Sequence, residues 1–117
     1  MAGADGKVAP IYLQKTDQTM QSAGGVIMSA NDALRLLELM IEDGRLGGRQ
    51  IIPVSAIAQS RTPMAQVGDM FEGYRREQYG LGWYLGPYRG EPMLHDFGSF
   101  AGFRTHVSYL PRRRVGV

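Results

Sequence analysis

The residue types best suited to catalysis gather in one stretch, from His95 to Leu110, which reads HDFGSFAGFRTHVSYL. It places His95 beside Asp96, followed shortly by Gly98 and Ser99. A histidine or a carboxyl group can transfer a proton, and glycine lets a ligand approach the backbone closely. We therefore expect any chemistry of this chain to lie near these four residues.

The same stretch has the pattern of a β-hairpin. Phe97 lies before its glycines, and Val107 and Tyr109 follow them at the alternating spacing of a strand. Gly98 and Gly102 punctuate the middle, as expected where a tight turn joins two strands. The candidate catalytic residues are thus predicted on the first strand of a hairpin.

Three aromatic residues, Phe97, Phe100 and Trp83, are candidates to line an acyl or aryl pocket. Aromatic residues at strand spacing are more often core residues, so both interpretations stay open. His95 alone is more often a hydrogen-bonded strand residue than a catalytic one, and we expect His106 to be structural or exposed. Two histidines without a third ligand predict no metal site, and no other cofactor is indicated.

The composition is that of one modest globular domain, with 117 residues, 44% of them apolar and 21% charged. The net charge of +2 owes much to Arg112–Arg114, interpreted as a solvated hairpin tip, and predicts no nucleic-acid partner. The absence of cysteine excludes disulfides and a cysteine nucleophile but leaves the compartment open. No apolar run approaches the roughly 20 residues of a membrane span.

Two helices are predicted upstream of the hairpin. Ser29 is the expected N-cap, with Asp32 as the acid of a capping box. Apolar residues then recur at helical spacing from 33 to 41, and Gly44 takes the C′ position. A second, shorter helix is expected from Val54 to Arg61.

The remaining segments complete an α+β fold, with an antiparallel sheet of about three complete strands and flanking helices. Residues 1–21 are predicted to be an irregular lead-in, and residues 64–78 a surface loop long enough to cover a site. Residues 79–85 alternate like a strand, with glycines leaving a flat face on one side. Residues 86–90 are the predicted turn, and residues 91–97 should return antiparallel.

Several blocks of the sequence occur together in a recognisable order. They are SAGGV at residues 22–26, SAND at 29–32 with the leucine-rich helix after it, YGLGW at 79–83, and residues 95–111. In this order they resemble the C-terminal part of the serine β-lactamase-like hydrolases, which include class C β-lactamases, esterases and penicillin-binding enzymes. The resemblance implies a β-lactamase/transpeptidase-like fold, and hydrolysis of a small amide, β-lactam or ester through an acyl-serine intermediate.

That family uses a Ser-x-x-Lys nucleophile motif, a Tyr-x-Asn or Ser-x-Asn element, and a Lys-Thr-Gly or His-x-Gly strand. The only lysines here, Lys7 and Lys15, follow Ala4 and Tyr12 at the required spacing, so the nucleophile motif is absent. The sequence SAN at 29–31 fits the second element, but it coincides with the predicted helix start and is interpreted as a cap.

The third motif has a partial counterpart in the hairpin. Alignment on Gly98 puts Asp96 where the family has its cationic residue, whereas His95 lies one residue too far away for His-x-Gly. The resemblance also makes the backbone N–H of Ser99 the second oxyanion donor. A backbone donor does not depend on the side chain, so this role survives the replacement of the cationic residue.

We therefore expect residues 22–117 to be the C-terminal part of an incomplete β-lactamase-like domain that is inactive alone. A non-catalytic binding or assembly fragment is the alternative. With the N-terminal part absent and a strand only beginning at Val115, an apolar face and a sheet edge should be uncovered. Self-association, or pairing with the missing N-terminal part, is the expected consequence.

Overall fold

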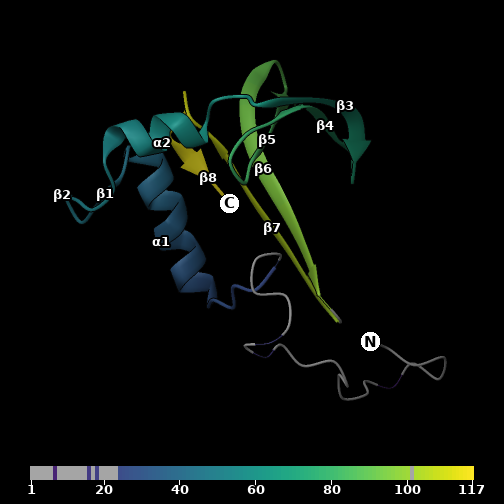
Figure 1. The fold of residues 1–117 in the computed structure, drawn as a ribbon, viewed down its shortest axis with the longest axis horizontal. Helices are drawn as coiled ribbons and strands as arrows, with labels where there is room; N and C mark the ends of the chain where they lie inside the picture. The colour runs from purple at the N-terminus through teal and green to yellow at the C-terminus, as the bar shows by residue number, and fades with distance from the viewer. Residues whose placement is uncertain (1–6, 8–15, 17, 19–23, 101) are drawn as a thin grey trace.

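The computed structural model describes residues 7, 16, 18, 24–100 and 102–117, so the predicted lead-in lies almost wholly outside the described residues. These residues confirm the α+β class, with two helices, a two-stranded sheet and a six-stranded antiparallel sheet (Figure 1). In chain order the elements are α1 (Ala30–Ile41), β1 (Arg45–Leu46), β2 (Arg49–Gln50), α2 (Val54–Ser60), β3 (Ala65–Phe71), β4 (Tyr74–Tyr79), β5 (Tyr84–Tyr88), β6 (Glu91–Phe100), β7 (Phe103–Leu110) and β8 (Val115–Gly116).

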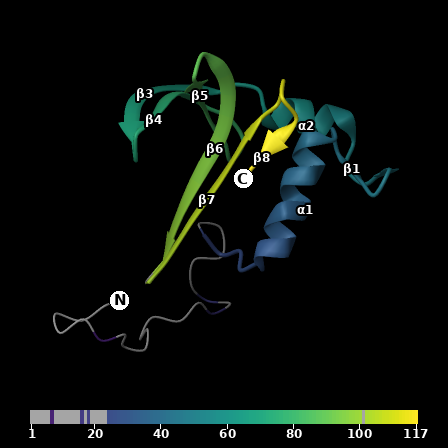
Figure 2. The same ribbon diagram turned by 180° about the vertical axis from the view of Figure 1, so that it is seen from behind.

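The large sheet is a simple meander in which each strand from β3 to β8 pairs antiparallel with the next. The predicted hairpin is confirmed as β6 and β7, whose last register pair joins Phe100 to Phe103. Both views show α1 and α2 beside one face of this sheet, with the long β6–β7 hairpin running beyond it (Figures 1 and 2). The opposite face, called the open face below, carries no helix of the described residues.

Helix α1 begins as predicted, because Ser29 and Asp32 form the reciprocal hydrogen bonds of a capping box. Its end differs by one residue from the prediction. Asp43 takes the left-handed C′ position at φ 51°, and the N–H of Gly44 donates to the Leu39 carbonyl at 2.7 Å. Gly44 is also required by packing, since a Cβ there would lie 2.1 Å from the Ile52 carbonyl oxygen.

The predicted loop over residues 64–78 is wrong, because this segment forms the β3–β4 hairpin. Every residue of β3 is exposed, and the better-covered positions of β4 are Tyr74, Arg76 and Gln78. Neither strand therefore carries the alternation of apolar and polar residues by which strands are recognised. A register irregularity between Gln66 and Asp69 further interrupts the pattern.

The predicted strand over residues 79–85 is also wrong. Tyr79 ends β4 and Tyr84 begins β5, and the N–H of Gly80 donates to the Trp83 carbonyl at 2.8 Å across the turn between them. Gly82 has φ 79°, which is incompatible with a strand. Because β5 continues to Tyr88, the predicted turn at 86–90 contracts to residues 89–90, and the sheet has six strands rather than three.

The hydrophobic core lies between the helices and the sheet. Its buried members are Leu37, Met40, Ile57, Trp83, Leu94 and Tyr109. Arg61 joins three elements here, since it pairs with Asp43 at 2.8 Å and donates to the Tyr109 hydroxyl at 3.3 Å and to the Met40 carbonyl. No helix in the described part of the chain is long and apolar enough to cross a membrane.

Candidate active-site strand

Strand β6 carries most of the predicted site residues, and its alternation divides them between the two faces of the sheet. Leu94 lies in the helix-side core, so Asp96 and Gly98 share that side. His95, Phe97 and Ser99 therefore face the open side. The predicted catalytic residues are adjacent along one strand, but their side chains do not converge.

The distal half of β6 has a free edge. Strand β5 pairs with β6 only as far as His95, so among the described residues positions 96–99 of β6 pair with β7 alone. On β7, the backbone N–H and C=O of Ser108 bond to Val117, away from β6. His95 lies opposite Ser108, so its backbone N–H and C=O also point away from β7. Backbone groups alternate in direction along an antiparallel strand, and Ser99 is four residues after His95. The N–H and C=O of Ser99 therefore point away from β7 as well. The N–H of Ser99 is thus directed at the free edge.

Asp96 is half-buried next to this edge. Burial raises the pKa of its carboxyl group, while a hydrogen bond with the Phe97 backbone and the charge of Arg76 oppose that rise. The N–H of Phe97, also directed at the free edge, is therefore engaged by Asp96, whereas no protein acceptor in the described part of the chain is recorded for the N–H of Ser99. An acidic group and a backbone donor lie close together here.

Gly98 has a structural reason for being glycine. A Cβ at this position would lie 2.3 Å from the Thr105 Oγ1 on the neighbouring strand β7. Its φ is not positive, so space rather than backbone conformation excludes a side chain. Gly98 thus allows close packing of β6 and β7 on the helix side.

His95 is completely buried, and no described residue lies in ordinary hydrogen-bond geometry with either ring nitrogen, so that the Arg75 backbone supplies at most a weak hydrogen bond. Burial is the first cause that lowers its pKa to about 4, followed by the charges of Arg76 and His106, and a weaker contact with the Arg75 backbone opposes the shift. The ring is therefore neutral at pH 7 and closed to solvent. This placement favours the structural interpretation of His95 over proton transfer to a substrate.

The three candidate pocket aromatics are not brought together. Trp83 lies in the helix-side core with its ring edge-on to Tyr109 at 5.1 Å between centroids. Phe97 is on the open face, stacked on His106 at 4.2 Å. Phe100 is half-buried at the far end of β6. Of these, Phe97 lies along the free edge of β6, and Phe100 lies at the end of the same strand.

The open face holds a cluster that the sequence did not reveal. The Arg76 guanidinium lies over the rings of Tyr84 and Phe71, at 3.8 and 4.0 Å from their centroids. Tyr74 contacts both His95 and His106, at 5.4 and 5.0 Å between ring centroids. Arg76 could have indicated this cluster, since it lies at a buried position of β4. It was not recognised because residues 64–78 were interpreted as a surface loop.

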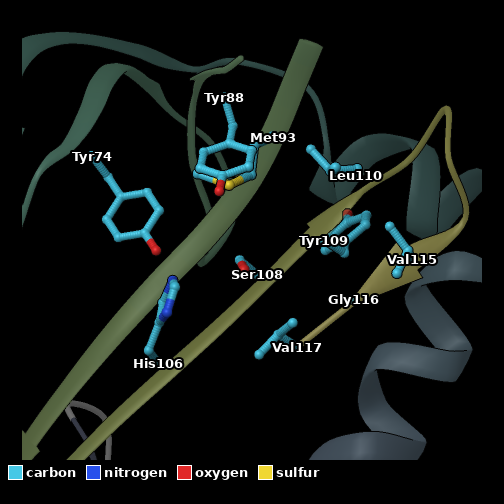
Figure 3. A pocket seen from close by; sticks show the side chains of 10 residues that line it. All are labelled: Tyr74, Tyr88, Met93, His106, Ser108, Tyr109, Leu110, Val115, Gly116 and Val117. Carbon is cyan, nitrogen blue, oxygen red and sulfur yellow. The ribbon is translucent and has the colours of Figure 1, made fainter.

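A cavity of about 190 Å³ adjoins this cluster on the open face and is lined by residues of β4, β5, β6, β7 and β8 and by Val117 (Figure 3). None of the predicted catalytic or pocket residues lines it. Among the described residues, no group of three or more histidine, aspartate or glutamate side chains is arranged to hold a metal ion.

Comparison with known proteins agrees with the resemblance found in the sequence. The Beta-lactamase family model matches residues 1–117, whereas no curated protein and no solved structure matches the chain. Because the match covers every residue and accords with the α+β fold, this chain belongs to the Beta-lactamase family and is serine hydrolase-like.

Proposed function

We propose that this chain forms one wall of the acyl-transfer site of a serine hydrolase that acts on a small amide, β-lactam or ester. The observation that carries the proposal is the direction of the Ser99 N–H, which points to the free edge of β6. A substrate carbonyl at this edge would meet a donor fixed by the sheet. Preorganised donors of this kind stabilise the oxyanion that forms when a serine attacks a carbonyl.

Asp96 would set the charge of this site. A carboxylate beside the oxyanion donor repels a substrate carboxylate and attracts an ammonium group or an N–H donor. The site would therefore prefer substrates without an acidic group next to the scissile bond. Among the three substrate classes, neutral esters and amides suit it better than β-lactams that carry a carboxylate.

The nucleophile must come from a segment outside this sequence, because no Ser-x-x-Lys is present. An oxyanion donor without a serine and its base has no acyl intermediate to stabilise. The chain alone should not hydrolyse a chromogenic cephalosporin or p-nitrophenyl esters above the rate in buffer. Turnover that survives repurification and disappears in Ser99→Ala would make Ser99 an unrecognised nucleophile and overturn the assignment.

The sharpest test removes the backbone donor itself, in a protein that joins this chain to a Ser-x-x-Lys segment. Ser99→Pro lacks the N–H, and because that N–H faces the free edge, no sheet hydrogen bond is lost. We expect kcat to fall by about 10²–10³-fold, the usual effect of losing one oxyanion donor. Ser99→Ala keeps the N–H and is the matched control. Equal activity of the two variants would exclude this role.

The alternative is a non-catalytic binding or assembly fragment. Asp96 in place of a cationic residue and the missing nucleophile both favour it. Strand β3 also offers an unpaired sheet edge, since it pairs only with β4 and all seven of its residues are exposed. Sedimentation at micromolar concentration should detect self-association through such edges. A clean monomer with cooperative unfolding would exclude the self-association proposed here.

A further inference from the structure

The β3–β4 hairpin leaves the plane of the sheet and crosses its open face. Among the described residues, two register pairs join β4 to β5, both at the end of β4. A Cβ on Gly86 of β5 would lie 1.8 Å from the Arg75 carbonyl oxygen, so the start of β4 lies directly on β5 instead of beside it. From there the ring of Tyr74 reaches His106 on β7, at 5.0 Å between centroids. The hairpin therefore covers strands that are not its neighbours in the sheet.

The last residue of β3, Phe71, reaches the free edge of β6. Its ring is edge-on to Phe97, at 5.2 Å between centroids. Its other contact is the Arg76 guanidinium, which lies 4.0 Å from the Phe71 ring and 3.8 Å from the ring of Tyr84, the first residue of β5. Phe71 thus lies on the open side of the corner where β5 begins and the edge of β6 becomes free.

Two features hold the tip of the hairpin in this place. Glu72 pairs with Arg104 at 3.1 Å, and Arg104 is the register partner of Ser99. Glu72 and Gly73 both have positive φ, 49° and 84°, as in the tight two-residue turn that matches the twist of its strands. The tip is therefore fixed beside the proposed oxyanion donor.

The ring of Phe71 keeps apolar surface that a ligand can reach, since the residue is 40% exposed. Ser99 follows Phe97 by two residues on the same face of β6, a distance of about 7 Å along a strand. A substrate whose carbonyl accepts from the Ser99 N–H can therefore place a phenyl group against Phe71 and Phe97. Asp96 lies on the other face, so the two flanks of the edge differ in polarity.

We propose that Phe71 and Phe97 form an apolar wall of the hydrolase site, and that this wall selects neutral esters or amides with a phenyl-sized group next to the scissile bond. The inference rests on the proposed function and adds a specificity residue, Phe71, from the hairpin that crosses the open face. Aromatic rings in edge-on or offset contact attract beyond their buried area, so the wall holds a phenyl group better than a small alkyl group.

The kinetic test uses the protein that joins this chain to a Ser-x-x-Lys segment. We expect kcat/KM to be higher for benzyl acetate or ethyl phenylacetate than for ethyl acetate, and Phe71→Ala to reduce that preference by about tenfold. Phe71→Leu, which keeps an apolar side chain, should retain part of it. Met70→Ala is the matched control, because Met70 is the adjacent exposed residue of β3 and should leave the preference unchanged. A preference that survives Phe71→Ala for both phenyl esters would overturn the proposal.

Nuclear magnetic resonance of the chain alone gives a second readout that needs no turnover. Benzyl acetate should shift the Phe97 ring signals saturably, ethyl acetate at the same concentration should not, and Phe71→Ala should weaken the binding by about tenfold. The absence of a saturable shift would contradict the wall.

The two readouts separate this inference from the proposed function. Phenyl binding at Phe97 in a protein whose activity survives Ser99→Pro would reject the oxyanion donor and keep the wall. Loss of activity in Ser99→Pro together with an unaltered phenyl preference in Phe71→Ala would reject the wall alone.

Discussion

Two arginines, one on each side of the sheet, show how differently its faces are built. On the helix side, Arg61 pairs with Asp43 and donates to the Tyr109 hydroxyl and the Met40 carbonyl, so its charge and geometry are matched. On the open side, the more deeply buried Arg76 rests on the rings of Tyr84 and Phe71, and no described residue forms a hydrogen bond with its Nε.

The difference separates a face whose buried arginine is paired within the chain from a face whose buried arginine rests on aromatic rings. A buried charge with good partners costs little, whereas an unpaired one is strongly unfavourable. Stacking on aromatic rings compensates Arg76 only in part, since such contacts contribute about 0.5–2 kcal/mol. We infer that the helix side, which holds the buried hydrophobic core, contributes most of the stability of the chain.

The largest expected effect contrasts an aromatic residue from each face. Trp83→Ala should lower the free energy of unfolding by about 3–5 kcal/mol, because Trp83 is buried in the helix-side core. Phe97→Ala should lower the free energy of unfolding clearly less, because Phe97 is only half-buried on the open face. Urea denaturation followed by circular dichroism measures both. If Trp83→Ala kept its stability but lost substrate binding in an active protein, Trp83 would be a pocket residue after all.

The next effect is the pH dependence of stability. The pKa of His95 is lowered from 6.5 to about 4, and that of His106 is also lowered, in both cases by burial first. The unfolded chain then binds more protons, so stability is complete above about pH 6.5 and falls as the pH drops towards 4. For His95 the loss reaches up to about 1.4 kcal/mol per pH unit.

Urea unfolding between pH 7 and 4.5 checks this, and His95→Leu should flatten most of the slope. The raised pKa of Asp96 has the opposite effect, because the folded chain then binds a proton more readily than the unfolded chain as the pH falls. Asp96→Asn removes this gain, so the free energy of unfolding should fall more steeply at the lowest pH. A pH-independent stability between 6.5 and 5 would mean that His95 is not buried as a neutral ring.

The two arginines themselves give an effect of intermediate size. Arg61→Met should lower the free energy of unfolding by about 2 kcal/mol, because Asp43 and the Met40 carbonyl lose their donor. Arg76→Met keeps an apolar side chain among the rings and removes an unpaired charge, so stability should stay within about 1 kcal/mol or rise. Thermal unfolding of the two variants measures both changes in stability. A large loss of stability in Arg76→Met would mean that the charge of Arg76 has a partner in the folded chain.

The smallest effect concerns the start of α1. Ser29→Ala should lower stability by about 1 kcal/mol, because the side chain accepts from the Asp32 N–H in a complete capping box. Asn31→Ala is the control and should change little. If Ser29→Ala kept its melting temperature but lost ligand binding, the sequence SAN at 29–31 would be the Ser-x-Asn catalytic element rather than a helix cap.

The sequence by itself determined the elements whose signals are local. The cap at Ser29 was predictable because its hydrogen bonds join residues three positions apart. The β6–β7 hairpin was predictable because its turn residues lie between two short segments with a strand pattern. The same locality allowed the order of blocks from 22 to 111 to indicate the Beta-lactamase family.

Tertiary structure decided the rest. Strand β3 forms because it pairs with β4, and β4 also pairs with β5. The inward positions of β4 hold Tyr74, Arg76 and Gln78, which show no apolar periodicity. The burial of His95 and the free edge towards which the Ser99 N–H points depend on where β5 begins, at Tyr84 opposite His95, which is a property of strand register. Register arises from contacts between residues far apart in the chain, and a local pattern cannot encode it.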